Sequence, residues 1–443
     1  ELGDSSLFSI PLRIHHRPPL ESQEMAAYSA RAVGEGWHSG VEVRPHPVSQ
    51  RGRGVFATAP VPAGTVLLCD SAVASIQLPS NRYLLDGTLE GEQGSCCQWC
   101  GCFQGTLEQL CGHLTYNSPQ DGKQLLGGVL DSCSFPSDAR IITPPQAQFG
   151  PYCSEACSSA AKAKGVSYKG SGWGEALEVS IAHNEHFLLA WNILETALCS
   201  PCLGVCAGNV PPTDKCVEAI LSAVAGAEVL SLCYQSKWSR AGAGAGDAEN
   251  TESLRCALRE FKAATGDWEG CSSCRSRVLT LPVYGSIVGL CLVNAHQVDI
   301  PHPLSEVLSM IPVPLTAELQ EILTGARKER EKKLAIMQRS EDSDEEESEE
   351  EIDFDYEGSA IYPSLSMINH SCAPSCSVRS ISFPQAGKLG VAIEVVAQRD
   401  LQQGEELSIS YIDQEMELEE RREELLDYGF LCDCSKCIAE EGE

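Results

Sequence analysis

The 443-residue sequence lacks long hydrophobic runs. No stretch approaches the roughly 18 to 20 uninterrupted apolar residues that a membrane span requires. The first residues, Glu1 to Asp4, also lack the basic stretch followed by an apolar stretch that marks a secretory signal. We therefore expect a soluble, intracellular protein with no membrane partner. Because the chain opens with Glu rather than Met, the presence of a targeting segment further upstream is left open.

Basic residues are scarce, because 32 Lys and Arg stand against 62 Asp and Glu, which gives a formal net charge of −30. Binding to the DNA backbone depends on Lys and Arg that neutralise phosphates, so we expect no direct DNA binding. An acidic surface steers basic partners toward it, and lysine-rich polypeptide tails are the obvious class. A hydrophobic content of 43% is sufficient for two or three domains with buried cores.

Cysteine is abundant, with 23 residues in the chain. Where secretory features are absent, thiols stay reduced, and grouped cysteines then indicate metal sites. Two tight pairs, Cys199-x-x-Cys202 and Cys271-x-x-Cys274, have no partner of familiar spacing and stay unassigned. Isolated cysteines are expected to be small buried hydrophobic residues; they are Cys69, Cys111, Cys216, Cys233, Cys256 and Cys291.

Segments rich in strand-forming residues occur at both ends of the sequence and enclose a cysteine-rich part and a helical part. We expect short strands at 41–43, 54–56, 65–68, 377–382, 389–396 and 406–412. Apolar residues at spacings of three and four predict helices at 173–198, 215–234, 253–265, 281–293 and 414–428. The two β-rich ends must meet to form one system of sheets, so the predicted fold class is α+β.

Shifts in composition divide the chain into seven segments. They are an N-terminal extension (1–40), a first β-rich part (41–95), a cysteine module (96–160), a helical insert (161–340), an acidic loop (341–357), a second β-rich part (358–413) and a C-terminal tail (414–443). The acidic loop holds twelve acidic residues in seventeen, and we expect it to be disordered because it cannot bury enough apolar surface.

The tetrad Asn369-His370-Ser371-Cys372 follows the apolar run 361–368. A lone His in such a place is more often a structural hydrogen-bonding residue than a catalytic one. Near the end of the chain, Cys432-x-Cys434-x-x-Cys437 supplies three thiolates, and a tetrahedral zinc ion needs a fourth. Cys372 can provide it. We therefore predict a zinc site that fixes the C-terminal tail onto the tetrad.

Three aromatic residues follow the tetrad, namely Tyr411 at the end of a predicted strand, Tyr428 and Phe430. Their rings could belong to the core or could line a narrow channel for a lysine side chain. A glycine-flanked turn, Arg51 to Phe56, would let the backbone approach a ligand closely, although an ordinary β-turn is favoured. It follows a strand rather than preceding a helix, which excludes a dinucleotide-binding loop.

Together these residues resemble the SET-domain lysine methyltransferases, specifically the group in which a MYND-like zinc finger splits the SET domain, and the plant trithorax-related branch within it. The resemblance covers residues 40–440 and is strongest at Tyr284–Asn294 and from Ser359 onward. It implies S-adenosylmethionine as cofactor, with Tyr411 as the catalytic tyrosine and with Tyr428 and Phe430 shaping the lysine channel. The residues it implies for cofactor binding are Arg53, Val55, Asn294, Asn369, His370 and Phe430.

The resemblance also implies that segments 41–95 and 358–413 form a split SET domain of small twisted sheets, that 96–160 is the finger, and that 414–443 is a zinc-bound post-SET tail. One finger zinc would be held by Cys97, Cys100, Cys153 and Cys157. A MYND finger holds two zinc ions, and this sequence departs from that pattern. The candidates for a second set do not match its spacing; they are Cys96, Cys102, Cys111, His113, Cys133, His183 and His186.

Methyl transfer to lysine requires a neutral amine, whereas a free lysine has a pKa of about 10.4. An apolar aromatic channel next to the positive charge of the cofactor would lower that pKa. We expect a protein-lysine N-methyltransferase that acts as a monomer on a histone-tail lysine in the nucleus, with the cytoplasm as a second location. Two alternatives stay open: a non-histone substrate, such as a ribosomal protein, and a zinc-held interaction scaffold whose SET fold is inactive.

Overall fold

The fold was analysed in a computed structural model. It describes residues 14–15, 37–48, 52–77, 95–130 with gaps, 152–163, 185–225 with gaps, 234–235, 248–265, 271–300, 317–328 with a gap, 356–381 and 391–441. Within these residues no single helix has the length and apolar composition of a membrane span. Helices α11 (Ser272–Val278) and α12 (Leu281–Asn294) have that length and composition only when they are taken together, and they are bent by 67° relative to each other.

Three small sheets join the two ends of the sequence. One has the order β11 (Asn369–His370), β14 (Glu406–Ile409), β3 (Arg53–Ala57), β2 (Val41–Pro45). A second has the order β12 (Cys376–Ser380), β13 (Ala392–Ala397), β4 (Val66–Ser71). The third has the order β5 (Ala74–Gln77), β10 (Tyr356–Ile361), β9 (Ala295–Ile300).

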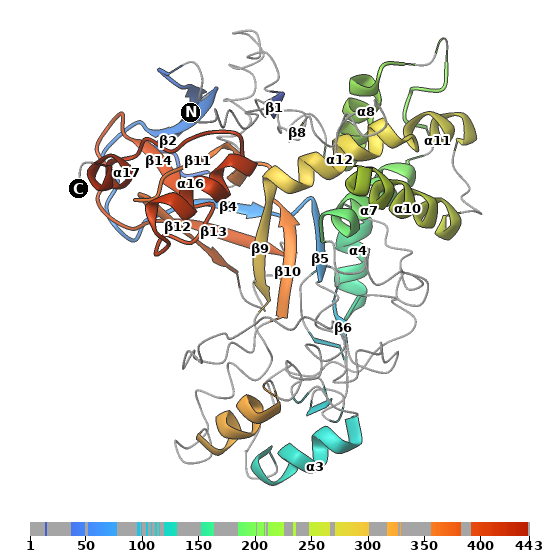
Figure 1. Cartoon of the computed structure of the whole chain (residues 1–443), viewed down its shortest axis with the longest axis horizontal. Helices are drawn as coiled ribbons and strands as arrows, with labels where there is room; N and C mark the ends of the chain where they lie inside the picture. The colour runs from blue at the N-terminus through green and yellow to red at the C-terminus, as the bar shows by residue number, and fades with distance from the viewer. Residues whose placement is uncertain are drawn as a thin grey trace, which may run out of the picture.

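Each sheet pairs an early strand with a late one, namely β3 with β14, β4 with β13 and β5 with β10. The prediction that the two β-rich ends meet is therefore confirmed. All pairs in the three sheets are antiparallel except the short parallel pair of β11 and β14. Figure 1 shows the late strands, in orange and red, lying among the early blue ones.

A group of helices packs beside the third sheet and forms a second hydrophobic core. Its members are α7 (Glu185–Leu198), α8 (Thr213–Ala225), α10 (Ala248–Ala264), α11 and α12. In Figure 1, α12 runs from the other helices toward the sheets and continues into β9. Ala74, Ile76 and Ile361 belong to the same core, so the sheet of β5, β10 and β9 is packed against the helices.

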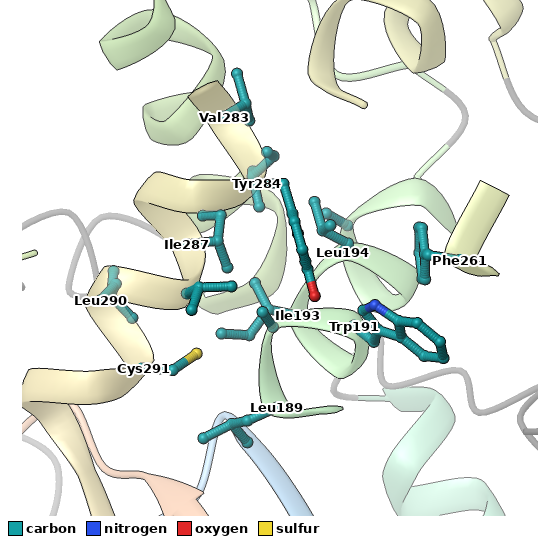
Figure 2. Packing of buried hydrophobic residues seen from close by; sticks show 14 of the residues in the cluster. Leu189, Trp191, Ile193, Leu194, Phe261, Val283, Tyr284, Ile287, Leu290 and Cys291 are labelled. Carbon is teal, nitrogen blue, oxygen red and sulfur yellow. The ribbon is translucent and has the colours of Figure 1, made fainter. Parts of the chain in front are cut away.

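Large side chains fill the centre of this helical core (Figure 2). Trp191 on α7 lies 5.6 Å from Phe261 on α10, measured between ring centroids, at a tilt of 50°. Tyr284 on α12 is fully buried, and its hydroxyl donates to the carbonyl of Phe187 over 3.4 Å. Burial raises the pKa of Tyr284 well above its usual value, so it remains neutral. Truncating a buried aromatic residue of this size to Ala costs about 3–5 kcal/mol.

The remaining described elements are short. They are β1 (Ile14–His15) paired with β8 (Tyr234–Gln235), β6 (Ser95–Cys96) paired with β7 (Phe103–Gln104), α3 (Pro119–Leu130), α4 (Glu155–Ala163), a helix at 317–326, a 3-10 turn η6 (Leu365–Met367), α16 (Leu418–Asp427) and α17 (Ser435–Glu440). In Figure 1, α16 and α17 lie beside the strands near the C-terminus.

Several predicted boundaries differ from the structure. The helix predicted at 215–234 is wrong at its end, because α8 stops at Ala225 and Tyr234 pairs with His15 in a strand. The segment predicted as a disordered acidic loop overlaps β10, since Tyr356 and Glu357 pair with Ile300 and Asp299. In both cases pairing with a distant strand decides the local structure. The rest of that loop, 341–355, and most of the N-terminal extension lie outside the described residues.

The helix predicted at 414–428 begins later, at Leu418. Glu417 forms a capping box with Glu420, in which each side chain accepts from the other residue's backbone N–H. This arrangement fixes the start of the helix, because it satisfies donors that have no partner within the helix. Helix α17 was not predicted, and its N-cap residue is Cys434.

Candidate functional site

The tetrad begins on β11, at the edge of the four-stranded sheet, where Asn369 pairs with Ser408 and His370 with Ile409. The turn η6 leads into it. Its first backbone N–H groups, of Ser364 and Leu365, donate to Asp70 Oδ2 over 2.8 and 3.0 Å. A carboxylate is favourable at such a terminus because the N–H groups there lack partners within the turn. Asp70 on β4 thus fixes the entry to the tetrad.

The side chain of Asn369 is held by two acceptors. Its Nδ2 donates to the carbonyl of Arg53 over 2.8 Å and to Glu406 Oε1 over 2.8 Å. Glu406 in turn lies 3.1 Å from Nε2 of His46. A Cβ atom at Gly54 would lie 2.7 Å from Glu406 Oε1 and 3.2 Å from Asn369 Nδ2, so a larger residue here would force the Glu406 carboxylate to shift. The glycine-flanked turn and the tetrad are therefore in direct contact.

His370 is buried, and both of its ring nitrogens are engaged. The backbone N–H of Tyr411 donates to Nδ1 over 3.0 Å, and Nε2 lies 3.2 Å from Cys372 Sγ. Since Nδ1 accepts, the proton of the neutral ring is on Nε2 and points at the sulfur. Burial, together with the positive charge of Arg421, lowers the pKa of His370 to about 4. His370 is therefore neutral near pH 7, and its predicted role in cofactor binding stays a prediction.

Three aromatic rings, of Tyr411, Tyr428 and Phe430, converge beside the tetrad and its His370. The ring of His370 lies 5.3 Å from Tyr411 and 5.9 Å from Phe430, measured between centroids. Tyr411 lies 5.1 Å from Tyr428. The Tyr411 hydroxyl donates to the carbonyl of Ile368 over 2.6 Å. Tyr411, Tyr428 and Phe430 are half-buried, unlike the fully buried Tyr284 in the helical core, so these rings face partly outward.

The four cysteines of the predicted tail site, Cys372, Cys432, Cys434 and Cys437, come together. Their Sγ atoms all lie within 4.8 Å of one another, and those of Cys437 and Cys372 are 3.5 Å apart. A tetrahedral zinc ion with Zn–S bonds of about 2.3 Å fits among sulfurs at such separations. We name this group the tail cluster.

Zinc ligation requires thiolates, and the surroundings of the tail cluster influence their formation. Burial raises the pKa of Cys372 and raises that of Cys432 to about 11. At Cys434 burial also opposes the thiolate, but the backbone N–H of Cys437 and the thiol of Cys432 outweigh it and lower the pKa to about 6. A divalent cation would offset the repulsion among four such charges.

Arg421 on α16 supplies a positive charge to the tail cluster and was not predicted from the sequence. It is only 1% exposed, and its guanidinium contacts Cys437 Sγ over 3.9 Å, the carboxylate of Glu440 and the carbonyl of Met416. A zinc ion with four thiolates would carry a net charge of −2, which a buried cation here would offset. Glu406 and Asp70, described above, were likewise missed, because their partners lie 37 and 294 positions away in the chain, beyond the reach of any local pattern.

Two of the residues implied for cofactor binding lie away from these contacts. Val55 is fully buried in the core of the sheets, so it is the least exposed of the set. Asn294 ends α12, and its Nδ2 donates to the carbonyl of Leu290 over 2.9 Å. The next residue, Ala295, pairs with Ile361 at the end of β10, from which the chain continues through η6 to the tetrad. Their role in cofactor binding stays a prediction.

Three of the four predicted finger ligands come together, namely Cys97, Cys153 and Cys157. The Sγ atoms of Cys153 and Cys157 are 3.6 Å apart, and the backbone N–H of Cys153 donates to Cys97 Sγ over 3.3 Å. Cys157 lies on α4. Cys100 lies outside the described residues. The three sulfurs fit a zinc ion that would take its fourth ligand from elsewhere.

Of the candidates for a second finger zinc, two are described and neither belongs to a metal-sized group. Cys111 is buried in the core that also holds the sheet residues, as predicted for an isolated cysteine. His186 lies on α7 in the helical insert, where burial lowers its pKa to about 4. The side chains of Cys96, Cys102, His113, Cys133 and His183 lie outside the described residues.

The chain is similar to several known lysine methyltransferases. The chain is 24% identical to histone-lysine N-methyltransferase ATXR2 of Arabidopsis thaliana, over 95% of this chain and 94% of that protein. It is 45% identical to human histone-lysine N-methyltransferase SMYD3 over 85 residues, which are 19% of this chain and 18% of that protein. A match to chicken N-lysine methyltransferase SMYD2 is 37% identical over 20% of this chain and 19% of that protein.

The SET domain family model matches residues 52–412, which are more than half of the chain. That range begins at the glycine-flanked turn and ends one residue after Tyr411. It encloses most of both β-rich parts, including the strands β3, β14 and β11 around the tetrad. The chain belongs to the SET domain family.

Proposed function

We propose that this protein is a protein-lysine N-methyltransferase that uses S-adenosylmethionine. The observation that carries the proposal is the convergence of Asn369, His370 and Tyr411 with the half-buried rings of Tyr428 and Phe430, next to a cluster suited to zinc. Membership of the SET domain family and relatives named as lysine methyltransferases support the same reaction.

S-adenosylmethionine would supply a methyl group on a positively charged sulfur. The residues proposed to hold it are Arg53, through its backbone, Val55, Asn294, Asn369, His370 and Phe430. The donor set fits such a ligand, because Asn369 and the Arg53 carbonyl are already fixed to each other beside the close approach of Gly54 to the Glu406 and Asn369 side chains. Groups fixed before binding lower the entropy cost of holding a ligand.

Tyr411 is proposed to position the lysine amine. Its hydroxyl donates its proton to the carbonyl of Ile368, so the oxygen lone pairs stay available to accept from an amine. The rings of Tyr428 and Phe430 would cover the apolar stem of the lysine. An apolar channel disfavours the ammonium form, which lowers the lysine pKa and yields the neutral amine that the reaction needs. Positioning, rather than acid-base catalysis by His370, is the main contribution.

The tail cluster is proposed to bind zinc and so to hold the aromatic residues in place. Tyr428 and Phe430 lie between α16 and Cys432, and they pack in the same hydrophobic cluster as Cys372, Leu425 and Cys437. Zinc binding would therefore fix the tail against the tetrad and with it one wall of the channel. The finger ligands Cys97, Cys100, Cys153 and Cys157 are proposed to hold a second zinc ion.

The proposed substrate is a lysine in a basic, flexible segment such as a histone tail. The formal net charge of −30 favours such a partner, and α16 carries Glu419, Glu420, Glu423 and Glu424 close to Tyr428 in sequence. A basic peptide would be steered toward this acidic surface, and its binding would weaken as salt increases. We propose action in the nucleus, with the cytoplasm as a second location, by a monomer that does not bind DNA directly.

The test of this function is Tyr411→Phe, assayed with radiolabelled S-adenosylmethionine and a mixture of core histones. Losing the hydroxyl should lower transfer at least ~100-fold, because a misplaced reacting group has effects of that size. Cofactor affinity, measured by calorimetry without substrate, should change less than about threefold. The matched control is Tyr284→Phe, which removes a buried tyrosine hydroxyl from the helical core and should retain transfer. Full turnover by Tyr411→Phe would contradict the assignment.

The substrate class needs a second experiment. Purified protein and labelled cofactor would be incubated with histones, nucleosomes, ribosomes and cell extract in separate reactions, and the labelled lysine mapped by mass spectrometry. Preferential labelling of histone tails supports the proposal. Labelling confined to a ribosomal or other protein would move the substrate outside chromatin. No transfer to any protein despite cofactor binding would favour an inactive SET scaffold.

A further inference from the structure

Four cysteines in the helical insert lie together, although no common sequence pattern links them. The group consists of Cys202, Cys206, Cys271 and Cys274, and its Sγ atoms all lie within 4.8 Å of one another. The Sγ of Cys202 is 3.4 Å from that of Cys206 and 3.6 Å from that of Cys274. We name this group the insert cluster. It is built from two segments that are about seventy residues apart in the chain.

The distances in the insert cluster match those expected around a metal ion. A disulfide would bring two sulfurs to about 2.05 Å, far closer than any pair here. The tail cluster shows the same separation, with 3.5 Å between Cys437 and Cys372. Four sulfurs at the corners of a tetrahedron with Zn–S bonds of about 2.3 Å are separated by about 3.8 Å. Both clusters therefore have the geometry of a tetrathiolate zinc site.

The first segment of the insert cluster forms a tight loop. Gly204 has a φ of 75°, a conformation that residues with a Cβ rarely adopt. This turn lets its backbone N–H donate to Cys202 Sγ over 3.4 Å. Backbone donors of this kind stabilise the thiolate form of a cysteine. The loop thus holds Cys202 and Cys206 close together and partly compensates the charge that a zinc ligand carries.

The second segment is the start of α11. Cys271 is its N-cap residue and Cys274 lies one turn further on, so both sulfurs emerge on one side at the end of the helix. Arg277 on the same helix donates to the carbonyls of Val205, Ala207 and Asn209 over 2.6, 3.2 and 3.4 Å. These bonds hold the loop against the helix independently of the sulfurs. The site is therefore fixed in place by protein contacts.

We propose that the insert cluster is a structural zinc site, additional to the zinc sites of the tail and the finger. Four thiols lose their protons on binding one Zn²⁺, and no electron is transferred. Four protein ligands fill a tetrahedral site and leave no open position for a substrate, which is typical of a structural role. The zinc would join the loop that follows α7 to the start of α11, the helix that precedes α12. The far end of α12 is Asn294.

The proposed ligand set differs from the pairing that the sequence suggests. Cys199-x-x-Cys202 is the obvious pair in sequence, but Cys199 does not belong to the insert cluster and Cys206 does. Cys199 therefore serves as a control from the same loop. Cys256, a half-buried cysteine on α10 outside any such group, is a second control.

The test measures the number of zinc ions per chain in the purified protein. Zinc is measured by plasma mass spectrometry, and the protein concentration is measured by amino-acid analysis. Cys206→Ser and Cys274→Ser should each lose one zinc equivalent relative to the unaltered protein. Cys199→Ser and Cys256→Ser should lose none, and Cys206→His, which keeps a zinc ligand, should retain the ion. Comparing variants separates this site from a second finger zinc, which would raise the total but would not respond to these substitutions. The count does not depend on methyl transfer.

A second measurement needs no variant, so a folding defect cannot obscure it. Cys202 is exposed and would react rapidly with N-ethylmaleimide if it were free. In the zinc-loaded protein we expect it to react at least ~10-fold more slowly than half-buried Cys256, and to become reactive after chelation, because coordinated thiolates are shielded. Rapid alkylation of Cys202 before chelation, a disulfide at Cys202, or unchanged zinc in both Cys206→Ser and Cys274→Ser would overturn the proposal.

Discussion

The C-terminal tail and the helical insert hold similar clusters of four cysteines in different surroundings. In the tail cluster three of the four cysteines are buried, and Arg421 and His370 contact their sulfurs. In the insert cluster only Cys274 is buried, and the neighbouring donors are backbone N–H groups such as that of Gly204. The same ligand geometry thus occurs once beneath a proposed reaction site and once at a joint between helices.

This difference suggests that the two regions depend on their cysteine clusters to different extents. The tail brings half-buried aromatic rings to the tetrad, and its fold depends on a cluster that joins Cys372 to three cysteines near the C-terminus. The insert has a large core of its own, with Trp191 and Tyr284 fully buried, and its cluster lies at the edge of that core. Losing zinc should therefore disrupt the tail much more than the insert.

The largest expected effect compares Cys437→Ser with Cys274→Ser. Cys437→Ser should lower methyl transfer at least ~100-fold, because Tyr428 and Phe430 lose the anchor that positions them. Cys274→Ser should lower it less than about tenfold, since the helical core still supports α12. Radiolabelled transfer assays on both proteins, with their zinc contents measured in parallel, provide the comparison. Equal losses of transfer would show that the insert cluster is as important to the reaction site as the tail cluster.

The next effect concerns the buried cation beside the tail cluster. Arg421→Gln should destabilise the protein by about 3–5 kcal/mol, because it leaves Glu440 and the thiolates without their positive partner. Arg422→Gln is the matched control. Arg422 pairs with the exposed Glu441, and surface ion pairs contribute only about 0–1 kcal/mol. Thermal unfolding of both variants measures the difference in stability. A similar shift in the unfolding temperature of the two variants would contradict a role for Arg421 in the zinc site.

The smallest expected effect concerns Gly54. Gly54→Ala places a Cβ against Glu406 and Asn369, and overpacking of this kind costs about 1–3 kcal/mol. The shift in Asn369 should weaken binding of S-adenosylmethionine by about tenfold, measured by calorimetry, a loss within the same energy range. Gly325→Ala, where nothing lies within 4 Å of the new Cβ, should leave cofactor binding unchanged. Unchanged binding of S-adenosylmethionine to Gly54→Ala would show that the glycine-flanked turn is not part of the cofactor site.

Much of the fold could be predicted from local patterns. Strands β2, β3, β4, β12, β13 and β14 occur where alternating and β-branched residues predicted them. The periodic apolar residues of 281–293 became α12 almost residue for residue. The boundaries failed where distant pairing dominates, as at Tyr234 and Tyr356. A two-residue strand has almost no pattern of its own, so its partner decides its structure.

The candidate site was predictable in its most distinctive residues only. The tetrad and the spacing of Cys432, Cys434 and Cys437 identified the tail cluster, and the structure brings its four cysteines together. Arg421 and Glu406 were not predicted, because charged residues are common in these segments and nothing local marks them as buried or as contacts of the tetrad. Cys202 was noticed, but its obvious partner in sequence, Cys199, was not the one the fold selects.

The sequence by itself determined which chemical groups are present and the local spacing of short motifs. Those properties depend on bonds along the chain and on helical or strand periodicity, which operate over a few residues. The tertiary structure alone decided that Gly54 lies against Asn369, that Arg421 lies beneath Cys437, and that two cysteine segments of the insert share one site. Such contacts arise because burying the two cores brings together segments that lie from sixteen to more than three hundred residues apart in the chain, which no local pattern encodes.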